Sequence, residues 1–379
     1  LFNSFVPHSL RNDFRVSSVR TSLEERIFEF ARQKSILEDA ACAKEVISRL
    51  RRAFANYRLE AFGDETGSFA SAPLCDLGLP IQLVKSTSSA LFGRLQPADN
   101  ISLESSEISL EDLMVHHNRI LLTGGAGVGK STLLKILCNE WSKGGKSWHE
   151  KYVCVLHIRF ARLIPLIERS GGVVSWEDVM VAEVFEGQES QRNSAARFWK
   201  WLQRNSRRVL WLLDGYDEIE DCVRRMRCVL FERTCKGELE GFDNMILSTR
   251  PEAKGQTLLH ESVHVDVLGF SGDVIQHYVC NYVTDGTASR KLLQLLKMNS
   301  WLQSACRVPI NLQLVCLVFC SNRSNWETAS FSFRITDIYA TALDLFLDRS
   351  HECRSWARGV LDGTRKALRQ LAWESFQDQ

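Results

Sequence analysis

The residues with the clearest chemical potential lie in one glycine-rich segment. They are Gly124, Gly125, Ala126, Gly127, Val128, Gly129, Lys130, Ser131 and Thr132. The first eight fit the spacing G-x-x-x-x-G-K-[ST] at every fixed position. Glycines let backbone N–H groups turn inward without an obstructing Cβ, which creates a nest for anions. A chance match in a chain of this length is roughly a one-in-a-hundred event. The segment therefore predicts a site for nucleotide phosphates, with Lys130 reaching the β- and γ-phosphates and Ser131 ligating Mg²⁺.

A strand and a helix flank this segment, as the motif requires. Ile120–Leu122 is a short apolar strand, and Leu133–Leu137 carries apolar residues at helical spacing. A helix that begins near Gly129 directs the positive end of its dipole toward the same point as the inward N–H groups. Strand, loop and helix together predict a P-loop.

A run of acidic residues follows a second apolar strand. Val209–Leu213 is apolar throughout, as expected of a parallel strand that is buried on both faces. Asp214 would then lie beside the P-loop, where Mg²⁺ needs a carboxylate. Gly215 lets the chain turn away, and Asp217 or Glu218 could orient or deprotonate an attacking water molecule. The alternative is a strand that simply ends in solvated acids.

An arginine ends the next strand. Met245–Pro251 reads MILSTRP, and ligands of such folds bind at the carboxyl ends of the strands. Arg250 could therefore contact a γ-phosphate and distinguish a triphosphate from a diphosphate. The alternative is a surface arginine that precedes a proline turn.

Strands and helices alternate along the middle of the chain. The expected strands are 153–158, 209–213, 244–248 and 262–268, and the expected helices between them are 179–185, 195–202 and 218–234. This alternation implies right-handed βαβ units and a parallel sheet. From Ser271 onward the pattern is helical, and Pro309 opens one helix because proline suits a first helical turn. Further helices are expected from Thr336 and from about Trp356.

The N-terminal region has a helical pattern. We expect no regular structure in residues 1–20, a helix from the capping box Ser22–Glu25, a second helix with its apolar face between Ala43 and Phe54, and a strand at Leu59–Phe62. The polar residues 84–106 are expected to form a linker.

Residues 23–79 are also similar to the start of polymerase-β-like nucleotidyltransferases. Asp64 replaces the serine of that family's Gly-Ser turn, and Gly78 stands where a second metal-binding aspartate would follow Asp76. A two-metal site cannot be built from Asp76 alone. We therefore interpret this region as a helical segment and not as an active domain.

Composition is that of an ordinary globular protein. The 379 residues are 45% hydrophobic and 25% charged, which allows two or three domains. A net charge of +1 argues against general binding to nucleic acids or membrane surfaces, and no apolar stretch reaches the ~20 residues of a membrane span. The 12 scattered cysteines suit buried free thiols in a reducing, cytoplasmic compartment. The first residues, which lack an initiator methionine, lead us to expect part of a longer gene product.

Taken in order, these motifs resemble one family. GGAGVGKST, LLDGYDE, LSTRP, LGFSGDVIQHYV, ACRVPINLQLVC and ITDIYATALDLFL are similar to the NACHT subfamily of STAND P-loop ATPases, whose best-known members are animal Nod-like receptors. The resemblance covers roughly Ser109–Arg349, and the Asp-Gly-x-Asp-Glu form of Walker B is its most specific feature.

The resemblance implies a fold, a set of domains and residue roles. A P-loop NTPase α/β domain with a parallel sheet flanked by helices would occupy residues 107–270, after a helical N-terminal segment (1–83) and the linker. An all-α helical domain (271–330) and the start of a winged-helix region (331–379) would follow. Asp214 would be the Mg²⁺-associated acid, Asp217 and Glu218 the hydrolytic acids, and Arg250 sensor 1. Pro309 would pack against the nucleotide base. His351 lies too early to be the family's winged-helix histidine.

The function expected on this basis is a signalling switch. It would bind ATP and ADP, hydrolyse ATP slowly with Mg²⁺ and form a homo-oligomer in the ATP state, in defence or stress signalling with unknown protein partners. One alternative is a nucleotide-binding scaffold without significant hydrolysis, although Asp217, Glu218 and Arg250 argue against it. Another is a metabolic P-loop kinase or GTPase, for which the chain shows neither a lid-like substrate site nor a clear Asn-Lys-x-Asp.

Overall fold

The computed structural model describes residues 14–56, 81–85, 107–145, 147–251 and 258–321. These divide into two compact units. Of the described residues, the first unit contains 14–56, 85, 107–123 and 131–266, apart from the gaps named above, and the second contains 81–84, the loop 124–130 and 267–321. The expected strand Leu59–Phe62, the nucleotidyltransferase-like motif and the helices from Thr336 and Trp356 lie outside the described residues. The domain boundaries expected from the sequence stay a prediction.

A six-stranded sheet forms the framework. Its strands are β1 (Ile81–Lys85), β2 (Arg119–Thr123), β3 (Cys154–Arg159), β4 (Val209–Asp214), β5 (Asn244–Thr249) and β6 (Val263–Phe270), in the order β1-β6-β2-β5-β4-β3. The pairs β2–β5, β2–β6, β3–β4 and β4–β5 are parallel. The predicted α/β fold of a P-loop NTPase is confirmed. Strand β1 was not predicted. Its five residues cross from the expected helical region (1–83) into the expected linker (84–106).

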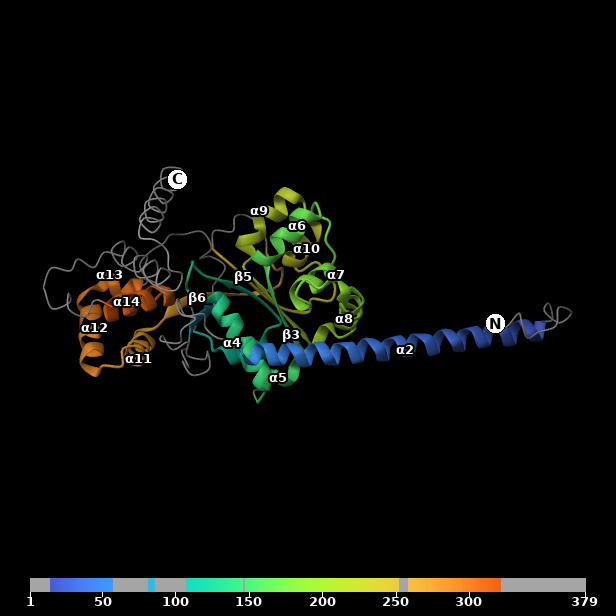
Figure 1. Ribbon diagram of the computed structural model, residues 1–379, viewed down its shortest axis with the longest axis horizontal. Helices are drawn as coiled ribbons and strands as arrows, with labels where there is room; N and C mark the ends of the chain where they lie inside the picture. Colours follow the sequence, from blue (N-terminus) through green and yellow to red (C-terminus); the bar gives the residue numbers. More distant parts are fainter. Residues whose placement is uncertain (1–13, 57–80, 86–106, 146, 252–257, 322–379) are drawn as a thin grey trace, which may run out of the picture. The chain divides into compact units, whose positions relative to one another are not determined.

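The helices of the first unit cover this sheet (Figure 1). They are α3 (Leu110–His116), α4 (Lys130–Lys143), α5 (Ser147–Lys151), α6 (Ile164–Arg169), α7 (Trp176–Val179), α8 (Arg192–Arg204), α9 (Tyr216–Met226) and α10 (Val229–Lys236). The single helix expected over 218–234 is instead two helices, because Arg227 adopts a left-handed conformation (φ 51°) that ends α9. The helix expected over 179–185 continues α7 as a π-helical turn, Met180–Val184.

The N-terminal region forms one long helix, α2 (Phe14–Ala55, 42 residues). The expected break into two helices is wrong, as is the expected start at Ser22, because no glycine or proline interrupts the segment and the capping-box pattern falls inside the helix. Ala43 and Val46 are buried in the same hydrophobic cluster as residues of α8. Residues 29–37 are all exposed, so the N-terminal part of α2 runs past this packing surface (Figure 1).

Polar contacts fix the packed part of α2. Arg204 Nη1 of α8 lies 2.7 Å from Oδ2 of Asp39, whose side chain is only 3% exposed. At the other end, the Asn139 side-chain amide on α4 donates to the carbonyl oxygens of Phe54 and Ala55. These carbonyls belong to the last turn of α2, where no intrahelical donor is available.

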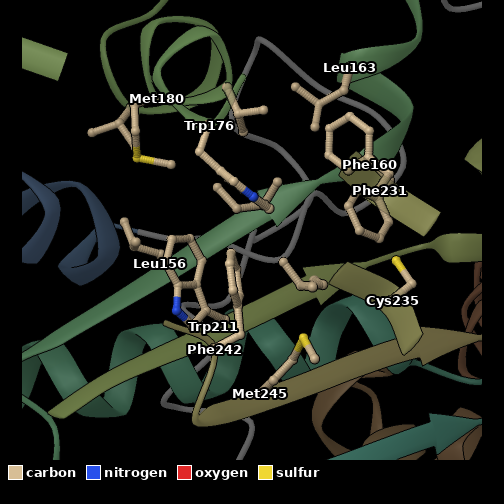
Figure 2. Close-up of a cluster of buried hydrophobic side chains, with 14 of the residues drawn as sticks. Leu156, Phe160, Leu163, Trp176, Met180, Trp211, Phe231, Cys235, Phe242 and Met245 are labelled. Atoms are coloured by element: carbon tan, nitrogen blue, oxygen red, sulfur yellow. The ribbon is translucent and has the colours of Figure 1, made fainter. Parts of the chain in front are cut away.

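The two faces of the sheet have different contents. On one face, Trp211 of β4 packs against Trp176 and Phe242 with ring centroids 5.3 and 4.5 Å apart (Figure 2). Trp199 stacks on Trp176 with ring centroids 5.7 Å apart. Leu156 and Met245, the register partners of Trp211 on β3 and β5, belong to the same cluster. Side chains alternate along a strand. The opposite face therefore receives the polar residues described in the next subsection.

The second unit has its own core. Its helices are α11 (Gly272–Tyr282), α12 (Gly286–Met298), α13 (Ser300–Ala305) and α14 (Pro309–Ser321), and they share one hydrophobic cluster. The Phe270 N–H at the end of β6 donates to the Arg307 carbonyl at 2.7 Å. A Cβ on Gly269 would lie 2.2 Å from that same carbonyl oxygen, so only glycine fits there.

Two expectations from composition can be compared with the described residues. All the cysteines of this part of the chain are free, and most are buried as predicted: Cys138, Cys154, Cys222, Cys228, Cys235, Cys306 and Cys316. Cys42 and Cys320 are only partly buried, and Cys280 is exposed. Among the helices that the structure describes, none is both long and apolar enough to cross a bilayer.

The Asp39–Arg204 pair makes a stability prediction. Arg204→Ala should lower the free energy of unfolding by ~1–3 kcal/mol, because it leaves the buried Asp39 carboxylate without its guanidinium. Arg197→Ala is the matched control, since Arg197 pairs with Glu38 on the same two helices at an exposed position and should cost at most ~1 kcal/mol. Urea unfolding of both variants checks this, and equal losses would contradict it.

Candidate functional site

The P-loop lies in the second unit and is shaped by glycines. Gly127 and Gly129 have φ angles of 74° and 105°, which residues with a Cβ rarely adopt. Lys130 is the first residue of α4, and its Nζ donates to the carbonyls of Gly124 at 2.5 Å and Gly125 at 2.9 Å. The loop thus presents glycine backbone, a helix N-terminus and one ammonium group together, a combination suited to phosphate.

The start of α14 packs against this loop. A Cβ on Gly127 would lie 2.8 Å from Cγ2 of Ile310 and 3.2 Å from Cγ1 of Val308, so no other residue fits without displacement. Pro309 is the first residue of α14, as predicted, and lies between these two side chains in the sequence. Its predicted contact with a nucleotide base stays a prediction.

The first unit supplies a buried carboxylate. Asp214, the last residue of β4, is 8% exposed. The Ser131 hydroxyl, next in the chain after Lys130, donates to Asp214 Oδ1 at 3.0 Å, and the Ser248 hydroxyl on β5 donates to the same oxygen at 2.7 Å. Ser131 and Asp214 are thus brought together, as the sequence predicts for a pair that shares Mg²⁺.

A histidine approaches the other carboxylate oxygen. His157 Nε2 on β3 lies 3.5 Å from Asp214 Oδ2, and the histidine side chain is fully buried. Burial by itself would raise the pKa of Asp214, but the contacts with His157, Ser248 and Ser131 outweigh it and hold that pKa below its ordinary value. Burial raises the pKa of the neighbouring Cys138 thiol on α4, and the negative charge of Asp214 raises it further.

The chain turns sharply after Asp214. Gly215 has φ 80° and is the N-cap of α9, and its N–H donates to Ser248 Oγ at 2.8 Å. Asp217 and Glu218 follow in the first turn of this helix, where carboxylates are favoured by the helix dipole. Glu218 is exposed and Asp217 is partly buried.

Arg250, one residue after β5, pairs with one of these acids. Its Nε lies 2.8 Å from Asp217 Oδ2, with side-chain exposures of 48% and 16%. The sequence indicated separate roles for Arg250 and Asp217, and their ion pair was not predicted.

Two residues near Asp214 were missed entirely. Ser248 lies two residues before Arg250 in the LSTRP motif, and its position on the same side of the strand was the available signal. His157 is a lone imidazole in an otherwise apolar stretch of β3, which was also visible. Among the described residues, no group of three or more His, Cys, Asp or Glu side chains is placed to hold a metal ion. One carboxylate with hydroxyls suits Mg²⁺, because this ion takes most of its ligands from water and phosphate.

Comparison with known proteins agrees with this geometry. Residues 118–286 match the NACHT domain family. The chain is 27% identical over 285 residues to mouse (Mus musculus) NACHT, LRR and PYD domains-containing protein 10, covering 70% of this chain and 38% of that protein. It is 26% identical to human Protein NLRC5 over 235 residues, which is 60% of this chain and 12% of that protein.

A third relative has a similar identity to this chain and is likewise covered only in part. Bovine (Bos taurus) NACHT, LRR and PYD domains-containing protein 3 is 24% identical over 242 residues, which cover 60% of this chain and 22% of that protein. The chain therefore spans well under half the length of each of these NLR-family relatives. Residues 118–286 of this chain form a NACHT domain, and this domain together with the relatives supports a nucleotide-binding module.

Proposed function

We propose that this chain is a nucleotide-operated signalling switch that binds ATP and ADP with Mg²⁺ and hydrolyses ATP slowly. The observation that carries the proposal is the buried Asp214 carboxylate, which accepts a hydrogen bond from Ser131, the residue that directly follows the P-loop lysine. That contact joins the two motifs on which metal-assisted phosphate chemistry depends.

The residues present fit the nucleotide and its metal. Lys130 now donates to carbonyls of its own loop, and the same ammonium could donate to the β- and γ-phosphates. Ser131 and Asp214 offer the oxygen ligands that Mg²⁺ prefers. When bound, Mg²⁺ neutralises charge that develops on the phosphates.

Hydrolysis would require a base for water. Glu218 is an exposed carboxylate in the first turn of α9 and can take this role. Asp217 is the second candidate, but its carboxylate is engaged by Arg250. Because this pair would have to open before Asp217 could act as a base, turnover through Asp217 would be slow, and a nucleotide-binding scaffold without hydrolysis is the second candidate function.

The Arg250–Asp217 pair offers a way to sense the third phosphate. A guanidinium binds carboxylate and phosphate oxygens in the same way. Arg250 would therefore exchange Asp217 for a γ-phosphate, which ADP lacks, and this exchange would release Asp217 in the ATP state. Only a contact that differs between the two nucleotides can shift a conformational balance.

The contact of Gly127 with Ile310 supports a route to the rest of the chain. A shift of the loop on phosphate binding would press on the first turn of α14, because the space beside Gly127 is too small even for a Cβ, which would lie 2.8 Å from Cγ2 of Ile310. We propose that this movement exposes surfaces for homo-oligomeric assembly, and that the switch serves defence or stress signalling, as its relatives' family suggests.

The first test concerns phosphate binding. Lys130→Ala should weaken ADP and ATP binding by ~2–4 kcal/mol, because a charge-assisted contact is lost. Lys143→Ala, at the opposite end of α4, serves as the control and should bind as the unaltered chain does. Calorimetric affinity that survives Lys130→Ala would remove the basis for the nucleotide site.

A second test concerns the base. Glu218→Gln should keep ATP binding and slow single-turnover hydrolysis by ~100-fold or more, since an amide has nearly the same shape but is a poor base. Glu220→Gln on the same helix is the control. If hydrolysis is unchanged, the double variant with Asp217→Asn decides between Asp217 as base and a scaffold without hydrolysis.

The third test concerns nucleotide preference, measured by equilibrium titration in a Glu218→Gln background so that ATP persists. Arg250→Ala should weaken ATP binding ~5- to 150-fold, leave ADP binding nearly unchanged and reduce any ATP-dependent assembly seen by light scattering. Asp217→Asn should shift the preference the other way, toward ATP, because it frees Arg250. Equal losses for ATP and ADP in Arg250→Ala would mean that Arg250 only supports the local fold.

A further inference from the structure

His157 is a polar residue buried in the middle of β3, where an apolar residue is expected. The strand reads Cys-Val-Leu-His-Ile-Arg, and its first five residues are buried. Burying a polar group costs free energy unless it meets a partner, so a parallel strand of this kind normally carries an apolar residue here. The His157 side chain is fully buried, and its Nε2 lies 3.5 Å from Asp214 Oδ2.

The two oxygens of Asp214 are approached from different sides. Oδ1 accepts hydrogen bonds from the hydroxyls of Ser131 and Ser248. Oδ2 is approached by His157. The register explains this, because His157 pairs with Leu212 and its side chain therefore shares a face with Asp214, two residues further along β4.

We propose that His157 is a positioning residue for the metal site. Its Nε2–H contacts Oδ2 and fixes the plane of the Asp214 carboxylate, so that Oδ1 and the Ser131 hydroxyl keep the directions that octahedral Mg²⁺ requires. His157 does not touch nucleotide or metal. This inference rests on the proposed function.

The expected loss of Mg²⁺ affinity can be judged from other proteins in which a residue that orients a metal ligand has been removed. Removing a group that orients a metal-ligating carboxylate typically costs ~10- to 100-fold in metal affinity. Mg²⁺ is sensitive because it demands near-ideal geometry. The binding of metal-free nucleotide should not change, because Lys130 and the loop backbone do not depend on His157.

Two amide substitutions separate positioning from packing. In His157→Gln the side-chain nitrogen lies at about the place of Nε2, whereas in His157→Asn it lies at about the place of Nδ1 and cannot reach Oδ2. Both variants leave a polar residue in the strand, so their effects on folding should be similar. Val155→Ala, on the same face of β3 but not in contact with Asp214, is the packing control.

The experiment is a titration of the full chain with ADP at increasing MgCl₂, and again in EDTA. His157→Asn should need ~10-fold or more Mg²⁺ for half-maximal enhancement of ADP binding, and His157→Gln within about threefold of the unaltered chain. All variants should bind ADP equally in EDTA. Equal Mg²⁺ dependence in both amide variants, or in Val155→Ala and His157→Asn, would overturn the positioning role. Failure of the unaltered chain to bind ADP under any condition would instead overturn the proposed function.

Discussion

A carboxylate that leaves water needs partners inside the protein, and here this requirement falls on Asp214. Its partners come from elements far apart in the sequence: a serine at the start of α4, a serine on β5 and a histidine on β3. None of these contacts forms unless three parallel strands adopt the observed register and α4 packs across them. The buried charge of Asp214 therefore has its partners only when the whole sheet is correctly folded. The hydrogen bond from Ser131 to Asp214 also links α4 to β4.

The two faces of the sheet have different roles: one is an apolar support, and the other carries the polar residues around Asp214. The tryptophans and phenylalanines around Trp176 and Trp211 bury a large apolar area and make the sheet stiff. The opposite face can then tolerate a buried carboxylate, a histidine and a serine, which contribute little to stability by themselves. A stiff support of this kind would hold the oxygen ligands of the proposed Mg²⁺ site within the narrow geometry that this ion accepts.

Sequence reasoning succeeded where the determinants are local. The P-loop, the apolar strands and the turn at Gly215 could all be predicted, because each depends on a few neighbouring residues. The cluster around Asp214 could be predicted only in part, because His157 and Ser248 join it through strand register, which spacing does not reveal. The pairing of Arg250 with Asp217 was missed for the same reason. Helix ends were misjudged where a pattern had two meanings: Ser22 begins a capping box in sequence but lies within α2, and the break between α9 and α10 depends on a left-handed arginine.

The length of α2 has a mechanical consequence. A helix of 42 residues at ~1.5 Å per residue is ~63 Å long; of the residues whose burial the structure describes, 29–37 are exposed and the packed part begins at about Asp39. The ~38 Å of helix that precede Asp39 would act as an arm with a short base. Tilting the base by 10° displaces the far end by ~7 Å, more than a full helical turn. Small adjustments in α8 or α4 are thereby converted into a displacement as large as a side chain, without any change in the internal structure of the helix.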